Sequence, residues 1–296
     1  MSDKQAALGF QKLELNELPK YTGWPKRLME ASAATLYVKT AQEVYREYEG
    51  DKWSVLFTQI EQQNLGVDEV EVMQFNSPQN IACSLGDDVY IAPPLATRVL
   101  LASIIADKIE SVRHVGDPIV ELGAGTGAVI TRLAKDKRFA DATFHAGDFS
   151  PSSIKIIQHL AKAESVTIET GIYDFNATQS ELIIPPNSVI YISFAMAYMQ
   201  KTDVVFWGRL MQFKPRAILV AEPIYSYFRE QTLLGLLRKR YYEANDYNCE
   251  ILSSIQEAQQ QGILKIDHVE ENVMGINPLC PVSMITILPM VKTFTN

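Results

Sequence analysis

The chain has 296 residues, of which 47% are hydrophobic, and it carries a formal net charge of −8. This length and composition suit one α/β domain with an appendage and exclude a disordered protein, while the acidic balance gives no attraction to nucleic acid or anionic membranes. Because the N-terminus lacks a secretory pattern and the apolar runs are too short to span a bilayer, we expect a cytoplasmic protein with no nucleic-acid or membrane partner.

The first ninety residues predict a mixed region. Apolar residues recur at helical spacing over 26–49, with Gly50 as the expected stop, and a second helix is expected over 53–63. The stretches "VDEVEVMQF" and "IACSLGDDVYIAP" alternate like strands on either side of the turn-prone "NSPQN", which predicts a small hairpin or two covering strands. A double proline follows, so residues 1–92 are expected to form a mainly helical cap with a hairpin.

From residue 93 onward the pattern changes to alternating helices and strands. We expect helices over 95–110, 126–135, 151–163 and 202–213, strands over 117–122, 142–147, 165–169, 188–194 and 216–221, and, after a long helical stretch, strands near 263–273 and 282–289. Such alternation predicts a mainly parallel sheet covered by helices on both faces. Ligands of these sheets bind beyond the carboxyl ends of the strands.

A glycine-rich stretch, "ELGAGTGAVI", begins at such an end, directly after two apolar residues. Gly123, Gly125 and Gly127 allow a tight turn and a close approach of backbone to ligand. With Ala128 the stretch also matches GxGxxA, so a dinucleotide is one candidate ligand. Glu121 argues against it, because a carboxylate about 4 Å from a pyrophosphate is repelled by roughly 4 kcal/mol at an effective dielectric near 20. A ligand with an ammonium or sulfonium group is favoured instead.

This stretch resembles the first motif of class I S-adenosylmethionine-dependent methyltransferases. The resemblance covers roughly residues 95–296 and implies a Rossmann-like sheet, mostly parallel with an antiparallel last strand, and S-adenosylmethionine as cofactor. It implies that Glu121 contacts the amino end of the methionine moiety. The backbone from Gly123 through Ala124 and Gly125 to Gly127 would hold the cofactor.

Further cofactor residues are implied where later strands end. In "GDFSPSS", Asp148 follows the second strand and would accept the ribose hydroxyls, Phe149 would lie along the adenine, and Ser150 is expected to cap the next helix. In "GIYDFNA", Asp174 and the backbone of Phe175 would contact the adenine.

The resemblance also implies that the fourth strand ends at the cofactor's methyl group. Ser193, Phe194 and Tyr198 are therefore pocket candidates, and Tyr198 and Glu222, at the end of the fifth strand, are our candidate catalytic residues by position alone. Tyr90, before the first core helix, is expected to close over the methionine end. The histidines show no metal-ligand spacing, and no metal site is predicted.

Residues 223–262 exceed what a strand-helix-strand crossover needs, and they are rich in tyrosine and arginine. We expect this segment to be a lid over the acceptor, with Tyr225, Arg229 and Tyr242 as substrate-binding candidates, and Asn277 at the rim between the last two strands. An amphipathic helix with its basic residues in solvent is the alternative interpretation.

The expected function is transfer of a methyl group from S-adenosylmethionine to a small acceptor, aromatic or derived from an amino acid, as in natural-product biosynthesis. A peptide or protein acceptor, at a side chain or a terminal carboxylate, is the first alternative. A non-catalytic regulatory subunit that binds the cofactor is the second, and an NAD-dependent oxidoreductase is the last. The oligomeric state is left open.

Overall fold

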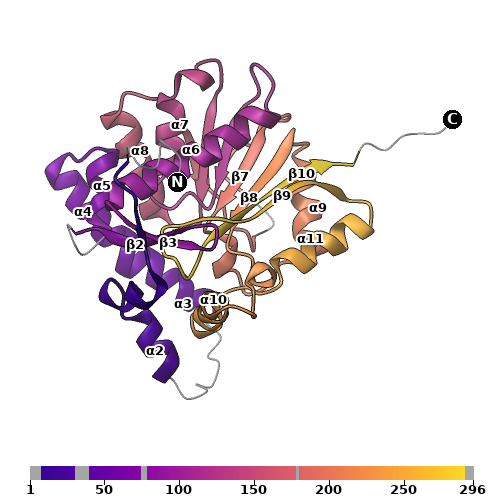
Figure 1. The fold of residues 1–296 in the computed structure, drawn as a ribbon. Coiled ribbons are helices and arrows are strands. Elements are labelled where there is room, and N and C mark those ends of the chain that lie inside the picture. Colours follow the sequence, from indigo (N-terminus) through magenta and orange to yellow (C-terminus); the bar gives the residue numbers. More distant parts are fainter. Residues whose placement is uncertain (1–7, 31–39, 75–78, 178–179, 291–296) are drawn as a thin grey trace.

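The computed structural model describes residues 8–30, 40–74, 79–177 and 180–290 (Figure 1). These residues form one ten-stranded sheet with strand order β1-β3-β2-β9-β10-β8-β7-β4-β5-β6. The five strands of its parallel part are β4 (Ile119–Leu122), β5 (Phe144–Asp148), β6 (Glu169–Ile172), β7 (Val189–Ser193) and β8 (Ala217–Glu222). All four residues of β4 and all six of β8 are buried, as expected for strands covered on both faces.

The last two strands form an antiparallel pair beside β8. β10 (Val282–Pro289) pairs antiparallel with β8, and β9 (Leu264–Gly275) pairs antiparallel with β10. The expected antiparallel last strand is therefore observed, and the expected parallel sheet corresponds to β8-β7-β4-β5-β6. The whole sheet is not mostly parallel as predicted, because it has four parallel and five antiparallel pairings.

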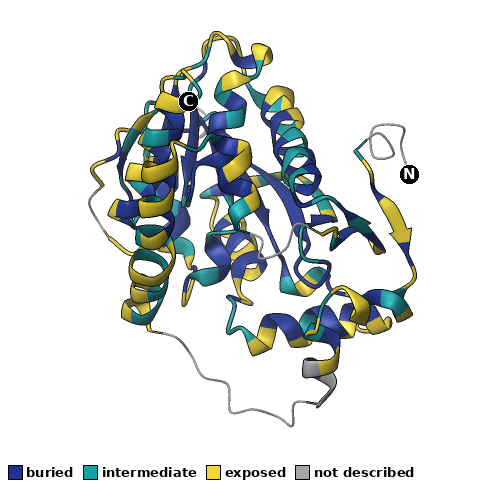
Figure 2. Cartoon of the chain, turned by 90° about the vertical axis from the view of Figure 1, so that its left-hand side faces the viewer, coloured by how far each residue is buried: buried dark blue, intermediate teal, exposed yellow. Residues whose placement is uncertain are grey.

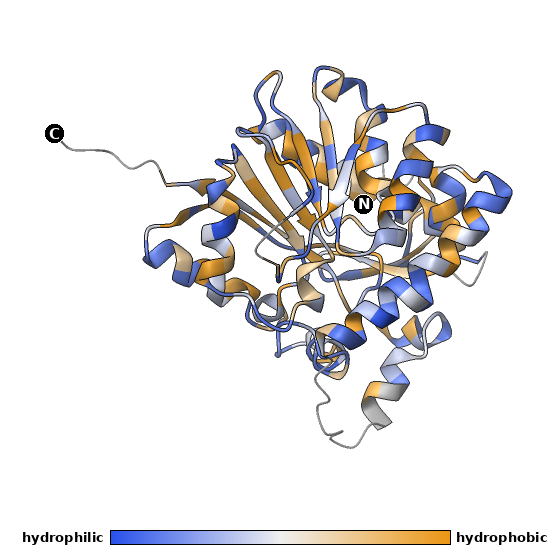
Figure 3. Ribbon diagram, turned by 180° about the vertical axis from the view of Figure 1, so that it is seen from behind, coloured by the Kyte–Doolittle hydropathy of each residue, from blue (hydrophilic) through white to orange (hydrophobic). Residues whose placement is uncertain are grey.

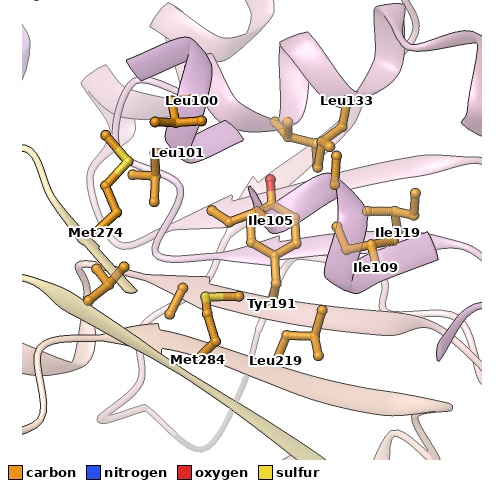
Figure 4. Close-up of a cluster of buried hydrophobic side chains, with 14 of the residues drawn as sticks. Leu100, Leu101, Ile105, Ile109, Ile119, Leu133, Tyr191, Leu219, Met274 and Met284 are labelled. Carbon is orange, nitrogen blue, oxygen red and sulfur yellow. The ribbon is translucent and has the colours of Figure 1, made fainter. Parts of the chain in front are cut away.

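Helices cover both faces of the sheet, with its strands as a buried layer between them (Figures 1 and 2). One face carries α6 (Pro94–Val112), α7 (Ala128–Lys135) and α8 (Pro151–Ala163), and the other carries α9 (Val204–Gln212) and α11 (Ile251–Gln260). The alternation of strand side chains divides the core, since Tyr191 packs on the α6 side and Ile190 on the α9 side. Figure 4 shows residues of α6, such as Ile105, packed against Tyr191 and Leu219. Apolar residues accordingly concentrate in the strands (Figure 3).

The N-terminal residues extend the same sheet and also pack on its helices. β2 (Ile81–Leu85) pairs with β9, β3 (Asp88–Ala92) pairs with β2, and β1 (Gln11–Leu13) pairs with β3. The short helices of this region are η1 (Leu15–Lys20), α2 (Trp24–Glu30), α3 (Ala41–Tyr45), the π-helix η2 (Arg46–Trp53), α4 (Ser54–Gln63) and α5 (Val67–Met73). α4 and η2 pack on α8, whereas α5 packs on α6 and α7.

Two predictions for this region are wrong. "VDEVEVMQF" contributes the helix α5 instead of a strand, because Val67, Val70 and Glu71 are buried at helical spacing while Val72 is 38% exposed. The hairpin turn is therefore at Gly86, between β2 and β3. Gly50 also fails to end a helix, since η2 runs through it directly into α4.

The helix expected over 26–49 is found only in its outer parts, α2 and α3 with the start of η2. Its middle, 31–39, lies outside the described residues. The helix over 53–63 corresponds closely to α4.

The other core elements lie within a few residues of their expected positions, with one exception. The strand expected over 165–169 begins only at Glu169, because Ser165 has a φ of 56° and the N–H of Val166 closes the end of α8 on Ala161. Among the described helices, none is both long enough and apolar enough to cross a bilayer.

The segment 223–262 contains η5 (Tyr225–Tyr227) and two helices. α11 covers the sheet beside α9, while α10 (Leu233–Ala244) packs against α2 (Figure 1). The buried Arg238 holds α10 in place, since its guanidinium donates to Asp87 Oδ1 at 2.9 Å, Gly86 O at 2.9 Å and Pro278 O at 3.0 Å. α10 is thus the part of this segment that exceeds an ordinary crossover.

Candidate active site

The glycine loop joins β4 to α7 in a left-handed backbone conformation that residues with a side chain rarely adopt. Gly123, Gly125 and Gly127 all have positive φ, of 73°, 54° and 69°. A Cβ on Gly123 would lie 2.3 Å from the Cβ of Ala195, so the loop can approach the end of β7 only with glycine there. The N–H groups of Gly123 and Ala124 donate to Gly147 O at 2.8 and 3.0 Å, which ties the loop to β5.

Asp148 ends β5 directly beside this loop. Its Oδ2 accepts a hydrogen bond from Gly125 N at 2.8 Å and its Oδ1 accepts one from Ser150 N at 3.0 Å. Burial raises the pKa of Asp148 to about 6, although both of these N–H groups lower it. The carboxylate is thus held rigidly at the carboxyl edge of the sheet.

Glu121 lies on the other side of the loop and is 3% exposed. Among the described residues, neither its Oε2 nor the Tyr191 hydroxyl has a partner within hydrogen-bond geometry, although Tyr191 lies close enough to influence the pKa of Glu121. Burial raises the pKa of Glu121 to about 8, and Tyr191 and the N–H of Ile130 lower it only in part. A buried, unsatisfied carboxyl oxygen is costly, which suggests that a cationic ligand completes it.

Two cavities meet at the glycine loop, and Gly123, Gly125, Phe194 and Tyr198 line both of them. The first cavity has a volume of about 180 Å³ and includes Asp148, Phe149, Asp174 and Phe175 in its lining. The second cavity has a volume of about 300 Å³ and includes Glu121, Ala124, Ser193 and Asn277. The structure thus brings together twelve of the candidate residues, namely Glu121, Gly123, Ala124, Gly125, Asp148, Phe149, Asp174, Phe175, Ser193, Phe194, Tyr198 and Asn277.

Two further candidates support the site from outside the cavity linings. Ser150 is the N-cap of α8 as expected, because its Oγ accepts from Ser153 N at 3.0 Å. Gly127 packs against Ile157, where a Cβ would come within 2.6 Å. Both therefore position the loop and α8, and neither lines a cavity.

The structure places four candidates away from both cavities. Tyr90 is 5% exposed and packs against Phe10, so it does not close over the second cavity. Tyr242 is fully buried, and its hydroxyl donates to Pro223 O and Asn248 O. Tyr225 instead donates to Glu243 Oε1 at 2.5 Å, and Arg229 is paired with Asp87 on the surface. Tyr225, Arg229 and Tyr242 are thus engaged within or near α10, whereas Tyr90 packs in the N-terminal part of the sheet.

Glu222 is also not a lining residue. It is fully buried, and its carboxylate accepts the N–H groups of Ala195 at 2.6 Å, Met196 at 2.8 Å and Ala197 at 3.4 Å. Burial raises its pKa to about 7, and these N–H groups lower it. The geometry corrects the expectation of a catalytic Glu222, because the residue positions the turn that carries Tyr198 without facing the cavities.

Glu222→Gln is therefore expected to lower the free energy of unfolding by about 1.5–3 kcal/mol, the usual contribution of hydrogen bonds to a charged group. The amide loses the charge and can point its NH₂ group at a backbone donor. Urea unfolding measures this effect. Unchanged stability together with a complete loss of turnover would contradict the structural role and restore the catalytic one.

Sequence reasoning missed the wall that the N-terminal helices contribute. Tyr48 and Trp53, from η2, line both cavities, and Tyr45 lines the first. Glu49 attaches η2 to α8, because it accepts from Ser150 Oγ at 2.5 Å and Ser152 N at 3.0 Å. A π-helix through a glycine has no recognisable sequence pattern, so these contacts could not be anticipated.

Several more lining residues of the second cavity were not assigned from sequence, among them Arg98 of α6, Tyr241 of α10 and Tyr247, which follows α10. The two tyrosines belong to the aromatic segment that was expected to form a lid, although different members of it had been chosen. For Arg98, the available signal was that it is the only charged residue over 94–106, the first part of this helix.

No protein-family model matches the chain, and no curated protein matches it. Several solved structures overlap with the chain. The [4+2]-cyclase SpnF overlaps with a TM-score of 0.51 at 13% sequence identity, over 86% of this chain and 97% of that one. The N,N-8-amino-8-demethyl-D-riboflavin dimethyltransferase RosA from Streptomyces davawensis overlaps with a TM-score of 0.46 at 13% sequence identity. The overlap covers 66% of this chain and 56% of RosA. A SAM-dependent methyltransferase from Aquifex aeolicus overlaps with a TM-score of 0.45 at 10% sequence identity. The overlap covers 63% of this chain and 89% of the Aquifex protein.

The structural neighbours are nearly all methyltransferases that depend on S-adenosylmethionine. This chain has the class I methyltransferase fold. The glycine loop, the sheet order and the antiparallel β10 agree with it. Because one neighbour is described as a cyclase, the fold by itself does not establish the reaction.

Within the class I fold, the described residues offer no group of three or more His, Cys, Asp or Glu side chains that could hold a metal ion.

Proposed function

We propose that this protein binds S-adenosylmethionine across the two cavities and transfers its methyl group to a small molecule. Asp148 would accept the ribose hydroxyls, Phe149 and Phe175 would enclose the adenine in the first cavity, and Glu121 would pair with the ammonium group in the second. When bound, the cofactor supplies a methyl group activated by a sulfonium sulfur. The chain's own residues orient it and exclude water, and such positioning can contribute roughly 7–11 kcal/mol to lowering the barrier.

The observation that carries this proposal is the unsatisfied, buried Oε2 of Glu121 in the lining of the second cavity. A pyrophosphate in this place would meet a carboxylate, whereas an ammonium or sulfonium group would find its partner. Asp148, beyond the glycine loop, is suited to a polar sugar edge because it is fixed by two backbone N–H groups. The two carboxylates thus match the two ends of the cofactor.

The second cavity favours an acceptor over a purely regulatory role. It continues past the glycine loop to Tyr241, Tyr247 and Cys280. This leaves space beyond the residues assigned to the cofactor, which a silent cofactor-binding subunit would not need. Its enclosure by aromatic side chains suits a small molecule.

Calorimetric titration with S-adenosylmethionine, with NAD in parallel, tests the proposal. We expect saturable binding of S-adenosylmethionine alone, and a loss of that binding in Glu121→Gln. Binding of NAD alone would overturn the assignment of Glu121 and with it methyl transfer.

We further expect proton release when the cofactor binds. With a pKa of about 8, Glu121 is mostly protonated at neutral pH in the ligand-free protein, and a cation favours its ionised form. Binding at pH 7 should therefore release up to about 0.9 proton, and affinity should rise as the pH increases towards 8 and then level off. Calorimetry in two buffers of different ionisation enthalpy counts these protons, and affinity that falls over this pH range would contradict the assignment.

A further inference from the structure

Four tyrosines from separate parts of the chain line the second cavity. The ring centroids of Tyr48 and Tyr198 are 5.1 Å apart, those of Tyr198 and Tyr247 are 5.2 Å apart, and those of Tyr241 and Tyr247 are 6.2 Å apart. Burial raises the pKa of all four hydroxyls above its ordinary range. At neutral pH they are therefore uncharged hydrogen-bonding groups and cannot act as bases.

The described lining of both cavities offers no side chain suited to remove a proton from an acceptor. It contains neither histidine nor lysine, and burial raises the pKa of its Cys280 thiol, which therefore stays protonated. Asp148 and Asp174 belong to the first cavity, where Asp148 bonds to Gly125 N and Asp174 to Asn176 N. In the second cavity Glu71 is paired with Arg132, whose Nε donates to it at 2.9 Å, and Glu121 is assigned to the cofactor. Acceptors that must be deprotonated, such as phenols, alcohols and ammonium groups, therefore find no base among the described lining residues.

Arg98 gives the second cavity a positive charge. It extends from α6 into the lining that also contains Tyr198 and the carboxylate of Glu71. Burial lowers the pKa of Arg98. A partly buried guanidinium attracts an anion, and its planar donors match the two oxygens of a carboxylate.

We propose that the acceptor is a small aromatic carboxylic acid, which Arg98 and the four tyrosines hold as its carboxylate and which is converted to a methyl ester. This inference rests on the proposed function. A carboxylate oxygen forms a bond to the methyl carbon while the bond from that carbon to sulfur breaks, and its electron pair stays on sulfur. The sulfonium becomes a neutral thioether, the carboxylate becomes a neutral ester, and no proton is transferred. The reaction therefore needs no base, in agreement with the lining.

The test uses the protein saturated with S-adenosylhomocysteine, so failure of that first binding step counts against the proposed function alone. Phenylacetate, its neutral isostere phenylacetamide and the cation phenethylamine are then titrated by calorimetry at pH 7. We expect phenylacetate to bind at least about tenfold more tightly than the amide, the lower limit for charge-assisted hydrogen bonds. Equal or tighter binding of the amide or amine, or no binding of phenylacetate at about 10 mM, would overturn the proposal.

Variants assign the preference to Arg98. Arg98→Gln should lower phenylacetate affinity to that of the amide and leave the amide unchanged, and Arg98→Lys should retain part of the preference if the Gln variant does not fold. Arg229→Gln is the matched control, because Arg229 is an exposed arginine outside both cavities. An undiminished preference in Arg98→Gln, or a loss of S-adenosylhomocysteine affinity in place of phenylacetate affinity, would show that Arg98 does not hold the acceptor.

A labelled methyl group identifies the acceptor atom. With labelled S-adenosylmethionine, label transferred to phenylacetate should be released as methanol by mild alkali, as from an ester. Label that appears on 4-ethylphenol or phenethylamine and not on phenylacetate would overturn the carboxylate as nucleophile, and so would the absence of any transfer to bound phenylacetate.

Discussion

Gly123→Ala is expected to abolish cofactor binding and to lower the free energy of unfolding by about 2–5 kcal/mol. The backbone at this position has a φ of 73°, and the new Cβ would lie 2.3 Å from that of Ala195. Part of the loss comes from the left-handed conformation and the rest from overpacking. Because the end of β7 and the loop must separate, the N–H groups of the loop leave their positions at both cavities.

Urea unfolding and calorimetry with S-adenosylhomocysteine measure the two effects. Gly208→Ala is the matched control, because Gly208 lies inside α9 and a Cβ there meets no atom within 4 Å. That substitution should be neutral or stabilise the protein by about 0.5–1 kcal/mol through the higher helix propensity of alanine. If Gly123→Ala binds the ligand as tightly as the unchanged protein, the loop is not the cofactor cradle.

Asp148→Asn is expected to weaken S-adenosylhomocysteine binding by a factor of about 10–150, which corresponds to the 1.5–3 kcal/mol of charge-assisted hydrogen bonds. The carboxylate accepts Gly125 N and Ser150 N and would still accept ribose hydroxyls through its remaining lone pairs. An amide has only one acceptor oxygen, so its NH₂ group faces either a backbone donor or the ribose.

The control for this variant is Asp203→Asn. Asp203 caps α9 by accepting from Phe206 N at 2.9 Å and lines neither cavity. Since Asn and Asp are similar N-caps, ligand affinity should not change there. An Asp148→Asn variant whose affinity is also unchanged would remove the ribose assignment.

The parallel core of the fold was predictable because its signals are local. The expected helix over 151–163 has the observed bounds of α8, with Ser150 as N-cap and Pro151 in the first turn. The failures occurred where distant packing chose between local alternatives. Val70 and Val72 alternate as in a strand, but burial against α6 and α7 selects a helix that leaves Val72 exposed.

The candidate site divides in the same way. Glu121, Gly123 and Asp148 could be recognised because each stands at the end of a strand, and parallel strands bring their carboxyl ends to one edge. Glu222 was found at such an end too, but its three backbone partners in the turn after β7 could not be inferred from its position.

By itself, the sequence determined the strand-loop-helix units, the glycine loop and the two acidic residues beside it, because hydrogen bonding and side-chain periodicity within a few residues specify them. Only the tertiary structure decided what faces the second cavity. Arg98 comes from α6, Tyr48 from the π-helix η2, and Tyr241 and Tyr247 from α10 and the residues that follow it. These segments meet because each buries apolar surface against elements far away in the chain, and no short pattern specifies which of their side chains then remain at the cavity.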